Sequence, residues 1–450
     1  MDLFGNIGSC IRDSFVMDYP SWGFYPFIKN QSVYSVPSRN AQIPSLSSSY
    51  LPRGLGRSYG DSCLNEDGTL LLSSQLNHFI SFDDNTGLLR CEAGVSFDEI
   101  LQFAVPRGWF LPVTPGTKFV TVGGAIANDV HGKNHHRAGN FGHHVLSFEL
   151  IRSTGERIIC SRDNHSDFFF ATIGGLGLTG LITWVEFRLT KIHSSSITQE
   201  QIQFDSLSDF FALSEQSEKE FEFTVSWVDC VTDSKDVRGI FIRGNHSDSA
   251  ESNNLSVHKT ETFKSVPLFF PNWVLNSFSI RAFNELYYRK NLTSHKRSIV
   301  HYEPFFYPLD SIHNWNKIYG KRGFLQYQFV IPYKQDAGAA LKEIFNLLKR
   351  SQMGSFLAVL KTFGSIPSEG LLSFPKEGVT LALDFPNHGE TLYRTLEQCD
   401  QIVRSVKGAV YPAKDARMSK ESFAEFYPRM NEFEKYIDPN FSSSFWRRVK

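Results

Sequence analysis

The stretches PRGLGRSYGD at residues 52–61 and PGTKFVTVGGAIANDVHGKNHH at residues 115–136 bear most directly on the fold of this chain. Glycine lets the backbone approach a ligand closely, and successive N–H groups in glycine-rich turns form concavities that bind anions. Two such stretches, separated by strand-like sequence, predict a site for a long cofactor that contains a pyrophosphate. The second stretch also carries polar side chains that favour a redox or transfer cofactor: Asn128, Asp129, His131, Lys133 and Asn134.

Composition limits the class of protein. The chain has 450 residues, which is typical of two or three domains. Its 46 basic and 47 acidic residues give a formal net charge of -1, so no global field would attract nucleic acid or an anionic membrane. The six cysteines are scattered without a CxxC pair, which indicates reduced thiols and argues against a disulfide framework or a zinc ribbon.

The N-terminus, MDLFGNIGSCIRDSF, has no basic start followed by a long apolar core, so a signal peptide is not expected. The chain has no run of about 18 apolar residues, so no membrane-spanning helix is predicted. We therefore expect a protein that is cytoplasmic or peripheral at a membrane.

Up to about residue 192, the pattern indicates short strands and turns. Residues 95–105 have helical periodicity, with Ser96 as the N-cap and Glu99 as its capping-box partner. Strands at residues 145–152 and 157–160 flank the turn STGE and predict a hairpin. Further strands are predicted at residues 69–72, 88–93 and 181–190.

From about residue 193, the pattern changes to an α+β unit with mostly antiparallel strands. Helices are predicted at residues 207–216, 337–351 and 390–406, the last ended by Gly408 near its C′ position. Strands are predicted at residues 221–228, 238–243, 324–331, 356–363 and 380–385. Residues 244–270 are polar and serine-rich, which is typical of a loop.

Two familiar motifs are rejected on their context. The sequence GLGLTG at residues 175–180 has the GxGxxG spacing of a Rossmann site, but such a turn opens a helix, whereas residues 181–190 alternate like a strand. His131 and His135 have i,i+4 spacing, but their polar, glycine-rich segment lacks an acidic general base, so no metal site is predicted. We interpret His131 as a polar group beside a cofactor; a turn histidine bonded to backbone is the alternative.

Three side chains outside the glycine-rich stretches leave two interpretations open. Lys414 follows the apolar residues 409–413, so it is either a lysine with a shifted pKa near the core or a solvated charge. Gln326 and Gln328 flank Tyr327 on a predicted strand and therefore face the same side. Two amides on one face suit a hydroxyl-rich ligand, and a solvent-facing polar stripe is the alternative.

Several motifs stand in a characteristic order between residues 50 and 429. They are RGLGRSYGD, PGTKFVTVGGAIANDVHGKNHH, GNFGHHV, GGLGLTG, GFLQYQFVIP, DFP at residues 384–386, YPAKDAR and YPR. Together they resemble the vanillyl-alcohol-oxidase-type FAD-binding flavoproteins, and within them the oxidases of polyprenyl-phosphate-linked ribose. The resemblance implies an α+β fold of the VAO/PCMH type. A two-part FAD-binding domain, at residues 1–192 and 409–450, would surround an antiparallel-sheet substrate domain at residues 193–408.

The resemblance also implies FAD as the cofactor. Covalent members of the superfamily carry a histidine about where Arg57 stands, so non-covalent FAD is expected. Both glycine-rich stretches would hold the pyrophosphate through backbone N–H groups. The implied cofactor-binding residues are Arg53, Gly54, Leu55, Gly56, Arg57, Ser58, Tyr59, Gly60, Asp61, Gly116, Thr117, Thr121, Val122, Gly123, Gly124, Asn128, His131, Gly132, Gly180, Ile182 and Tyr411.

The catalytic residues implied by the resemblance are Lys414, which would accept or steer the hydroxyl proton, and His131, which would place the sugar. The implied substrate pocket consists of Tyr59, Lys133, Ser226, Trp227, Gln326, Gln328, Lys361, Phe363 and Ala382. The mycobacterial member has cysteine at the position of Ala382 and asparagine at that of Thr380, so the exact substrate stays open. Three lysines in one pocket of a neutral chain favour a phosphorylated substrate.

The reaction implied is FAD-dependent oxidation of the C2 hydroxyl of a polyprenyl-phosphate-linked ribofuranose to the 2-keto sugar. It would be the first half of an epimerisation that makes the arabinose donor of a cell envelope, with a separate NAD(P)H-dependent short-chain reductase as partner. The alternatives are an aldonolactone- or alditol-type FAD oxidase of a free sugar and a flavin-binding component without turnover. The apolar residues 266–283 either receive the isoprenoid near a membrane surface or form an ordinary buried element.

Overall fold

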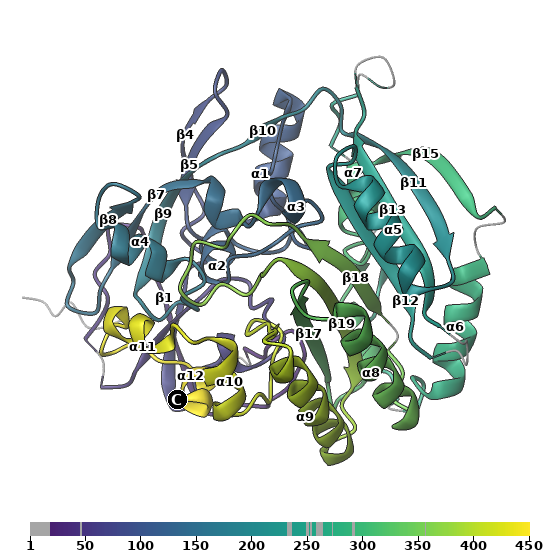
Figure 1. Ribbon diagram of the computed structural model, residues 1–450. Helices are drawn as coiled ribbons and strands as arrows, with labels where there is room; N and C mark the ends of the chain where they lie inside the picture. The colour runs from purple at the N-terminus through teal and green to yellow at the C-terminus, as the bar shows by residue number, and fades with distance from the viewer. Residues whose placement is uncertain are drawn as a thin grey trace, which may run out of the picture.

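In the computed structural model, a five-stranded sheet and an eight-stranded sheet divide the molecule into two lobes (Figure 1). The structure describes residues 19–450 except residues 46, 232–235, 249–251, 253, 258–263, 272, 290–292 and 356. The first lobe contains the five-stranded sheet, a three-stranded sheet and the C-terminal helices. The second lobe contains the eight-stranded sheet and the helices that cover it.

The sheets of the first lobe come from residues 31–188. The three-stranded sheet is parallel, in the order β1 (Gln31–Ser35), β3 (Gly68–Leu72) and β2 (Tyr50–Arg53). The five-stranded sheet is antiparallel, in the order β4 (Phe79–Asp83), β5 (Leu88–Glu92), β9 (Leu181–Arg188), β7 (Val145–Ile151) and β8 (Arg157–Ser161). Its helices are α1 (Phe97–Ala104), α2 (Val122–Ala127), α3 (His135–Ala138) and α4 (Ser166–Thr172). The predicted capping box of Ser96 and Glu99 at the start of α1 is confirmed, as is the predicted β7–β8 hairpin.

The eight-stranded sheet of the second lobe is antiparallel throughout. Its order is β15 (His295–His301), β11 (Ser196–Phe204), β13 (Arg238–His246), β12 (Phe223–Asp229), β18 (Ala358–Phe363), β19 (Gly378–Pro386), β17 (Phe324–Pro332) and β20 (Ala409–Val410). The antiparallel α+β unit predicted from the sequence is therefore confirmed.

Three amphipathic helices cover one face of this sheet: α5 (Leu207–Ser217), α8 (Ala337–Arg350) and α9 (Glu390–Ser405). Their apolar residues, such as Leu341 and Leu396, form one core with Leu360 and Leu381 of the sheet. The opposite face of β17, β18 and β19 carries polar side chains that reach His131 of the first lobe. The candidate site therefore lies where the two lobes meet.

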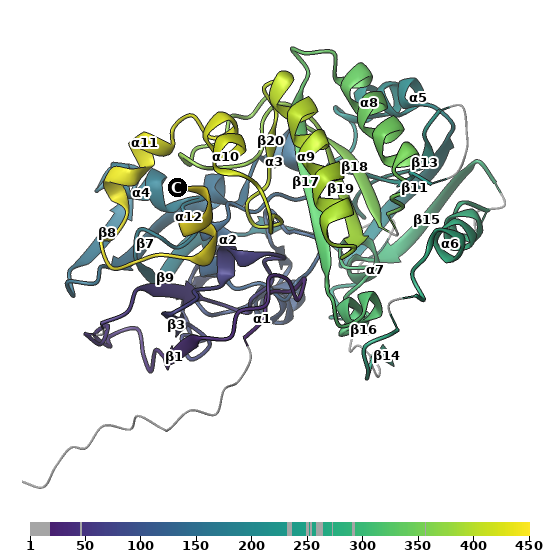
Figure 2. The same ribbon diagram turned by 90° about the horizontal axis from the view of Figure 1, so that it is seen from below.

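The C-terminal segment returns to the first lobe. Its helices α10 (Lys420–Phe426), α11 (Met430–Phe433) and α12 (Ser444–Val449) lie beside the early strands, as the yellow ribbon next to the purple and blue ones shows (Figure 2). Arg448 of α12 forms ion pairs with Asp61 at 2.7 Å and with Asp415 at 2.8 Å. Residues far apart in sequence thus jointly hold the end of the first glycine-rich stretch.

The remaining elements are small or peripheral. They are α6 (Ser277–Arg289), α7 (Tyr302–Phe306) and two short strand pairs, β6 (Trp109–Phe110) with β10 (Thr190–Lys191) and β14 (Lys264–Ser265) with β16 (Ile312–His313).

Several of these elements differ from the sequence predictions. Strands β11 and β15 and helix α6 were not predicted, and β13 and β14 enter the expected loop at residues 244–270. Strand β15, HKRSIVH, is an edge strand whose charged residues hide the alternation expected of a strand. The residue that adopts the left-handed conformation after α9 is Lys407, at φ 54, and not Gly408 as predicted. The N–H of Gly408 donates to the Val403 carbonyl.

Candidate active site

The first glycine-rich stretch presents a run of unbonded amides. Within the described part of the chain, the N–H groups of residues 54–58 donate no hydrogen bond. Gly56 has φ 63, a conformation that favours glycine. These residues are partly accessible, so their amides face neither a sheet partner nor a buried core. Such a run of N–H groups is a concavity suited to the anionic pyrophosphate of FAD.

The ends of this loop are held by internal contacts. Arg53 donates to the carbonyls of Cys63 and Pro20, both at 2.7 Å, and Asp61 is paired with Arg448. A Cβ at Gly60 would lie 1.7 Å from the Asp415 carbonyl oxygen. The side chains of Arg53 and Asp61 are therefore engaged in supporting the loop, and the structure does not offer them to a ligand.

Arg57 joins the two glycine-rich stretches. Its Nε donates to the Phe119 carbonyl at 3.1 Å, and its guanidinium lies over the Trp22 ring at 4.0 Å. Burial lowers the pKa of Arg57, although the Asp310 carboxylate acts to raise it. The side chain at the position implied for a covalent flavin anchor is thus a packed cation.

The second stretch is bonded differently from the prediction. Thr121 caps α2 by accepting from Gly124 N–H, and the amides of Val122 and Gly123 donate to the carbonyls of Val95 and Ala93. The N–H groups of Val122, Gly123 and Gly124 are therefore already hydrogen-bonded within the protein. This corrects the expectation that Val122–Gly124 continue the pyrophosphate-binding loop. The amides of residues 116 and 117 make no hydrogen bond within the described residues, so they are the part of this stretch that fits the cradle.

The residues implied to run along the flavin lie in two sets of contacts. The hydroxyl of Tyr411 donates to the Asn128 carbonyl at 2.8 Å, and the Tyr411 ring stacks on Phe374 with centroids 4.7 Å apart. Gly180, at φ 146, lies against Ile151, whose carbonyl oxygen would be 2.6 Å from a Cβ. Ile182 is buried beside it.

His131 stands at the centre of the polar cluster. Lys361 Nζ lies 2.7 Å from His131 Nδ1, and Gln328 Nε2 lies 3.0 Å from His131 Nε2. Phe363 packs edge-on to the imidazole, with centroids 4.9 Å apart. Burial and the charge of Lys361 lower the pKa of His131 well below its usual range. The imidazole is therefore neutral near pH 7. Because both ring nitrogens contact side chains of the second lobe, His131 is not a turn histidine bonded only to backbone.

The three predicted lysines meet around this histidine. Lys133 donates to the Phe305 carbonyl at 2.5 Å and Lys361 to the Gly132 carbonyl at 2.7 Å, whereas Lys414 lies 3.8 Å over the Tyr59 ring. Burial lowers the pKa of Lys133 to about 7 and that of Lys414 to about 8. The pKa of Lys361 falls well below its usual range because burial adds to repulsion from Lys133 and Lys414. Lys414 is thus a half-buried lysine with a shifted pKa.

Strand register decides which sheet residues face this cluster. Gln326 and Gln328 of β17 stand opposite Asp384 and Ala382 of β19, and directly opposite residues share a face. Gln328 is buried and bonded to His131, so the solvent-facing alternative for the glutamines is rejected. Trp227 pairs with Val359, which itself pairs with Ala382, so Trp227 lies on this face.

Ser226 does not lie on this face. It is paired with Leu360 and Phe241, whose side chains belong to the core under α5, α8 and α9. Adjacent residues on a strand point to opposite faces, so the Ser226 side chain is turned away from His131. This corrects the expectation that Ser226 lines the substrate pocket through its side chain.

Asp384 is the site residue that the sequence did not single out. It accepts a hydrogen bond of 2.5 Å from Gln326 Nε2 and is 1% exposed. The signal was present in the DFP motif and in the strand pattern of residues 380–385, but only the β17–β19 register reveals that it faces the lysines.

The comparisons with known proteins agree with this geometry. Residues 43–161 match the model of a family described as an FAD binding domain. The chain is 36% identical over 413 residues to the decaprenylphosphoryl-beta-D-ribose oxidase of Mycolicibacterium smegmatis, covering 89% of each chain. The chain belongs to the family of this oxidase.

Other relatives of this oxidase family are more distant. An uncharacterized protein in the mprA 5′ region of Streptomyces coelicolor is 27% identical over 377 residues, which is 79% of this chain and all of that one. The delta(24)-sterol reductase of Rattus norvegicus is 30% identical over 114 residues, 25% of this chain and 22% of its own. That match covers too little of either chain to carry an argument about substrate.

Membership of the oxidase family settles the general chemistry. The protein is an FAD-dependent oxidoreductase, and the open amides of residues 54–58 fit the cofactor. Among the described residues, no group of three or more histidine, cysteine, aspartate or glutamate side chains is arranged to hold a metal ion. In the same part of the chain, no helix has the length and apolar character needed to cross a bilayer.

Proposed function

We propose that the protein oxidises the C2 hydroxyl of a polyprenyl-phosphate-linked ribofuranose to the 2-keto sugar. The observation that carries the proposal is the meeting of Lys133, Lys361 and Lys414 around the neutral imidazole of His131. The similarity to the decaprenylphosphoryl-beta-D-ribose oxidase supports it over most of the chain.

Bound FAD supplies the ring that accepts the hydride of the alcohol carbon. Neutral His131, fixed by Lys361 and Gln328, can hydrogen-bond a sugar hydroxyl and place it. Lys414, whose pKa is lowered to about 8, can accept the hydroxyl proton as its amine. Gln326 and Gln328 present amides on the same face, which suits a ligand with several hydroxyl groups.

The charge of the pocket favours a phosphorylated sugar. Among the described residues, Asp384 is the carboxylate shown to act on this cluster, through Lys414, so the pocket has an excess of positive charge at a pH where the lysines are protonated. Burial makes this charge costly unless an anion pairs with it. A free alditol would leave the cations without a partner, which argues against the free-sugar oxidase.

An exposed apolar surface beside the pocket suits the lipid part of the substrate. Leu275 packs in one cluster with Tyr319 and Tyr59, which border Lys414 and Asp384. Near it, Trp273 is 75% exposed and Phe278 is 80% exposed. We propose that these side chains contact the isoprenoid and the membrane that holds it. The stretch is thus partly a buried element, as Val266 and Leu275 show, and partly an uncovered surface.

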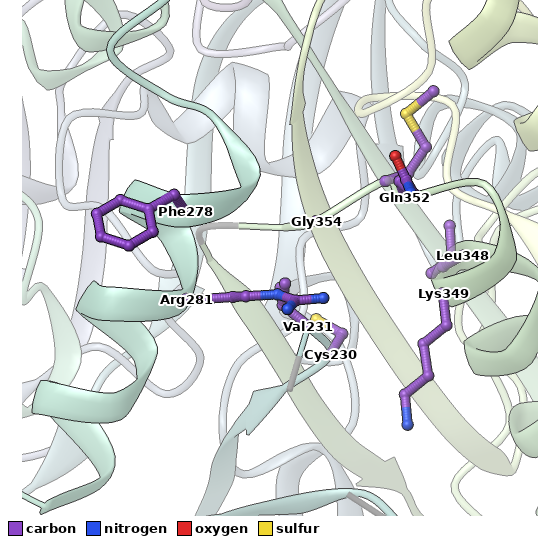
Figure 3. A pocket seen from close by; sticks show the side chains of 9 residues that line it. Cys230, Val231, Phe278, Arg281, Leu348, Lys349, Gln352 and Gly354 are labelled. Atoms are coloured by element: carbon purple, nitrogen blue, oxygen red, sulfur yellow. The ribbon is translucent and has the colours of Figure 1, made fainter. Parts of the chain in front are cut away.

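A hollow of about 350 Å³ lies beside this surface, between α6 and the end of α8 (Figure 3). Phe278 and Arg281 of α6 line it from one side, and Leu348 and Lys349 of α8 from the other. None of the residues expected to bind FAD or the sugar lines it. We therefore place the chemistry at His131 and regard the hollow as part of the lipid-facing side.

A reductase partner follows from the product. A 2-keto sugar becomes the epimer only when it is reduced on the face opposite to the one oxidised, which requires a second, NAD(P)H-dependent enzyme. The proposed partner is a short-chain reductase that takes over the lipid-linked keto sugar.

The experiment is anaerobic bleaching of the bound flavin by four compounds: ribose, ribose 5-phosphate, a short-chain prenylphosphoryl ribose and a long-chain one. We expect the rate per concentration to rise in that order. Equal bleaching by unphosphorylated ribose would overturn the lipid-phosphate assignment and favour the free-sugar oxidase.

The membrane contact has its own test. Vesicle flotation with Trp273→Ser and Phe278→Ser should show weaker binding than the parent, whereas Ile159→Ser, which alters a 52% exposed residue of β8, should not. Equal flotation of all four proteins would remove this surface from the proposal.

A further inference from the structure

Asp384 is held in a fixed position at the edge of the lysine cluster. It stands opposite Gln326 in the β17–β19 register, its amide donates to Ser355 Oγ at 2.9 Å, and its Oδ1 accepts from Gln326 at 2.5 Å. The carboxylate is therefore oriented by two strands and cannot rotate freely.

The second carboxylate oxygen of Asp384 has no short hydrogen bond. In the described part of the chain, Oδ2 of Asp384 is the one buried carboxylate oxygen without a hydrogen bond of 3.5 Å or less, and the Tyr319 hydroxyl is unpaired at the same limit. Tyr319 nevertheless acts on the carboxyl as a hydrogen-bond donor that lowers the pKa of Asp384. Asp400 shows the contrast, because its Oδ1 accepts from Tyr327 and its Oδ2 from Arg417. A buried oxygen without a short hydrogen bond costs free energy, so Oδ2 can take up a proton or a further donor beside Tyr319.

In the part of the chain that the structure describes, the Lys414 ammonium likewise has no hydrogen-bond acceptor close to it. Its ammonium contacts the Tyr59 ring, and no hydrogen bond or ion pair within 4 Å joins it to an acceptor among the described residues. Yet Asp384 and Lys414 act on each other electrostatically: the carboxylate raises the pKa of Lys414, and the lysine lowers that of Asp384. Burial still prevails at both, with the pKa of Asp384 raised to about 7 and that of Lys414 lowered to about 8.

We propose that Asp384 is a positioning residue that shares one proton with Lys414 and takes up, on Oδ2, the proton that Lys414 removes from the substrate. The inference rests on the proposed function for its chemical step. No ion pair of 4 Å or less joins the two groups, so the proposed transfer passes through a water molecule or a sugar hydroxyl between them.

The proton and the hydride leave the substrate by different routes. The O–H bond of the C2 hydroxyl breaks, and its proton forms an N–H bond on the Lys414 amine. The electron pair of the C2–H bond would leave as hydride, and bound FAD would supply the two-electron acceptor that the oxidation of the alcohol requires. The new ammonium then passes a proton to the Asp384 carboxylate, which restores the amine. Asp384 releases this proton to solvent before the next turnover, so both groups return to their starting state.

The other groups around the pair cannot take this role. Tyr59 and Tyr319 are buried phenols whose pKa values are raised well above the usual one, so they stay neutral. Gln326 does not titrate. A charge on Lys361 opposes one on Lys414, His131 is neutral, and Arg57 is engaged with Phe119 and Trp22. Asp384 is therefore the acceptor that faces Lys414.

The test measures the titration of Lys414 directly. Trace acetylation of the FAD-loaded protein by acetic anhydride across a range of pH, followed by peptide mass spectrometry, gives the pH midpoint at which Lys414 becomes reactive relative to the exposed Lys321. We expect Asp384→Asn to move the midpoint to lower pH by about one unit or more, because it removes an opposite charge. An unchanged midpoint would overturn the proposal.

Activity provides the second readout. If Lys414 must be an amine, the acid limb of anaerobic flavin reduction should move to lower pH in Asp384→Asn, and Asp384→Glu should restore the parent profile. Asp400→Asn is the matched control: it removes a buried carboxylate bonded to Arg417, so it should lower thermal stability but leave the Lys414 midpoint in place. A slower rate with no shift of the limb would mean that Asp384 is merely structural.

A second variant covers a failure of Asp384→Asn to fold. Gln326→Leu removes the bond that lowers the pKa of Asp384, so the carboxylate should be protonated at higher pH and the Lys414 midpoint should again fall. The acetylation needs no substrate. A shift without turnover of prenylphosphoryl ribose would therefore refute the proposed function alone, and turnover without a shift would refute only the role of Asp384.

Discussion

Lys361 and His131 stand 230 positions apart in the chain, yet Lys361 Nζ lies 2.7 Å from His131 Nδ1. The lysine comes from the sheet of the second lobe and the histidine from the glycine-rich stretch of the first. Because Gln328 approaches the other ring nitrogen, both sides of the imidazole are fixed by the second lobe. The position of His131 therefore depends on how the lobes are joined.

His131→Ala should reduce flavin reduction far more than stability. The substitution removes the group that places the sugar, and misplacement of a reactant can cost about 10²-fold. Lys361 keeps its bond to the Gly132 carbonyl, so the sheet loses little. Stopped-flow bleaching and thermal unfolding measure the two effects. The control is His144→Ala, which removes a histidine bonded to the Ala138 carbonyl and should leave the bleaching rate near that of the parent.

A collapse of the thermal midpoint of His131→Ala in proportion to its rate would show that the residue is structural. A parent-like bleaching rate would remove it from substrate placement.

Binding of a prenyl phosphate should take up protons at pH 8. With a pKa of about 7, Lys133 is mostly an amine at that pH. A bound phosphate raises the pKa of Lys133 toward its ordinary value, so the amine becomes protonated on binding. At pH 5.5 the lysine is already charged and its uptake should vanish. Calorimetry in two buffers of different ionisation enthalpy measures the number of protons.

Lys133→Met should take up fewer protons than the parent, whereas the exposed control Lys321→Met should match it. Proton release, or no proton change at pH 8, would contradict an anion site built from these lysines.

FAD should be released by acid. Arg57, packed between Trp22 and Phe119, cannot form the covalent link that a histidine forms in other members of the superfamily. Acid precipitation should leave all the flavin in the supernatant, where its absorbance can be measured. Yellow colour retained in the washed pellet would be evidence of a covalent bond elsewhere in the chain.

Arg448→Ala should destabilise the protein by about 3–5 kcal/mol, because it leaves the buried carboxylates of Asp61 and Asp415 without their cation. Denaturant unfolding measures the loss. Arg447→Ala, which alters the neighbouring exposed arginine, should cost much less. Similar losses in the two variants would mean that the ion pairs do not hold the C-terminal helices to the first glycine-rich stretch.

Local sequence patterns predicted local structure well, but they predicted contacts between distant segments poorly. The capping box at Ser96 and the β7–β8 hairpin follow from neighbouring residues, so the sequence predicted both. The resemblance predicted that the lysines and His131 share one pocket. It did not predict that the alternation of side chains along β12 turns Ser226 away from this pocket. Asp384 became visible only when register placed it opposite Gln326. The amides of Val122–Gly124 were expected to bind phosphate because glycine content does not reveal which N–H groups the fold consumes.

Gly54→Ala should weaken FAD binding, because Gly54 is where the two glycine-rich stretches touch. A Cβ at this position would lie 2.3 Å from Thr121 Oγ1, so Thr121 would have to turn and give up its bond to Gly124 N–H. Loss of such a cap costs about 1 kcal/mol, and the displaced loop carries the open amides of residues 54–58. We expect faster flavin loss on dilution, measured by fluorescence, and a lower thermal midpoint.

Gly338→Ala is the control: its Cβ would meet nothing nearer than 3.6 Å in helix α8, so stability should rise by about 0.5–1 kcal/mol with flavin retention unchanged. Retention of FAD by Gly54→Ala as tight as in the parent would show that this loop does not hold the cofactor.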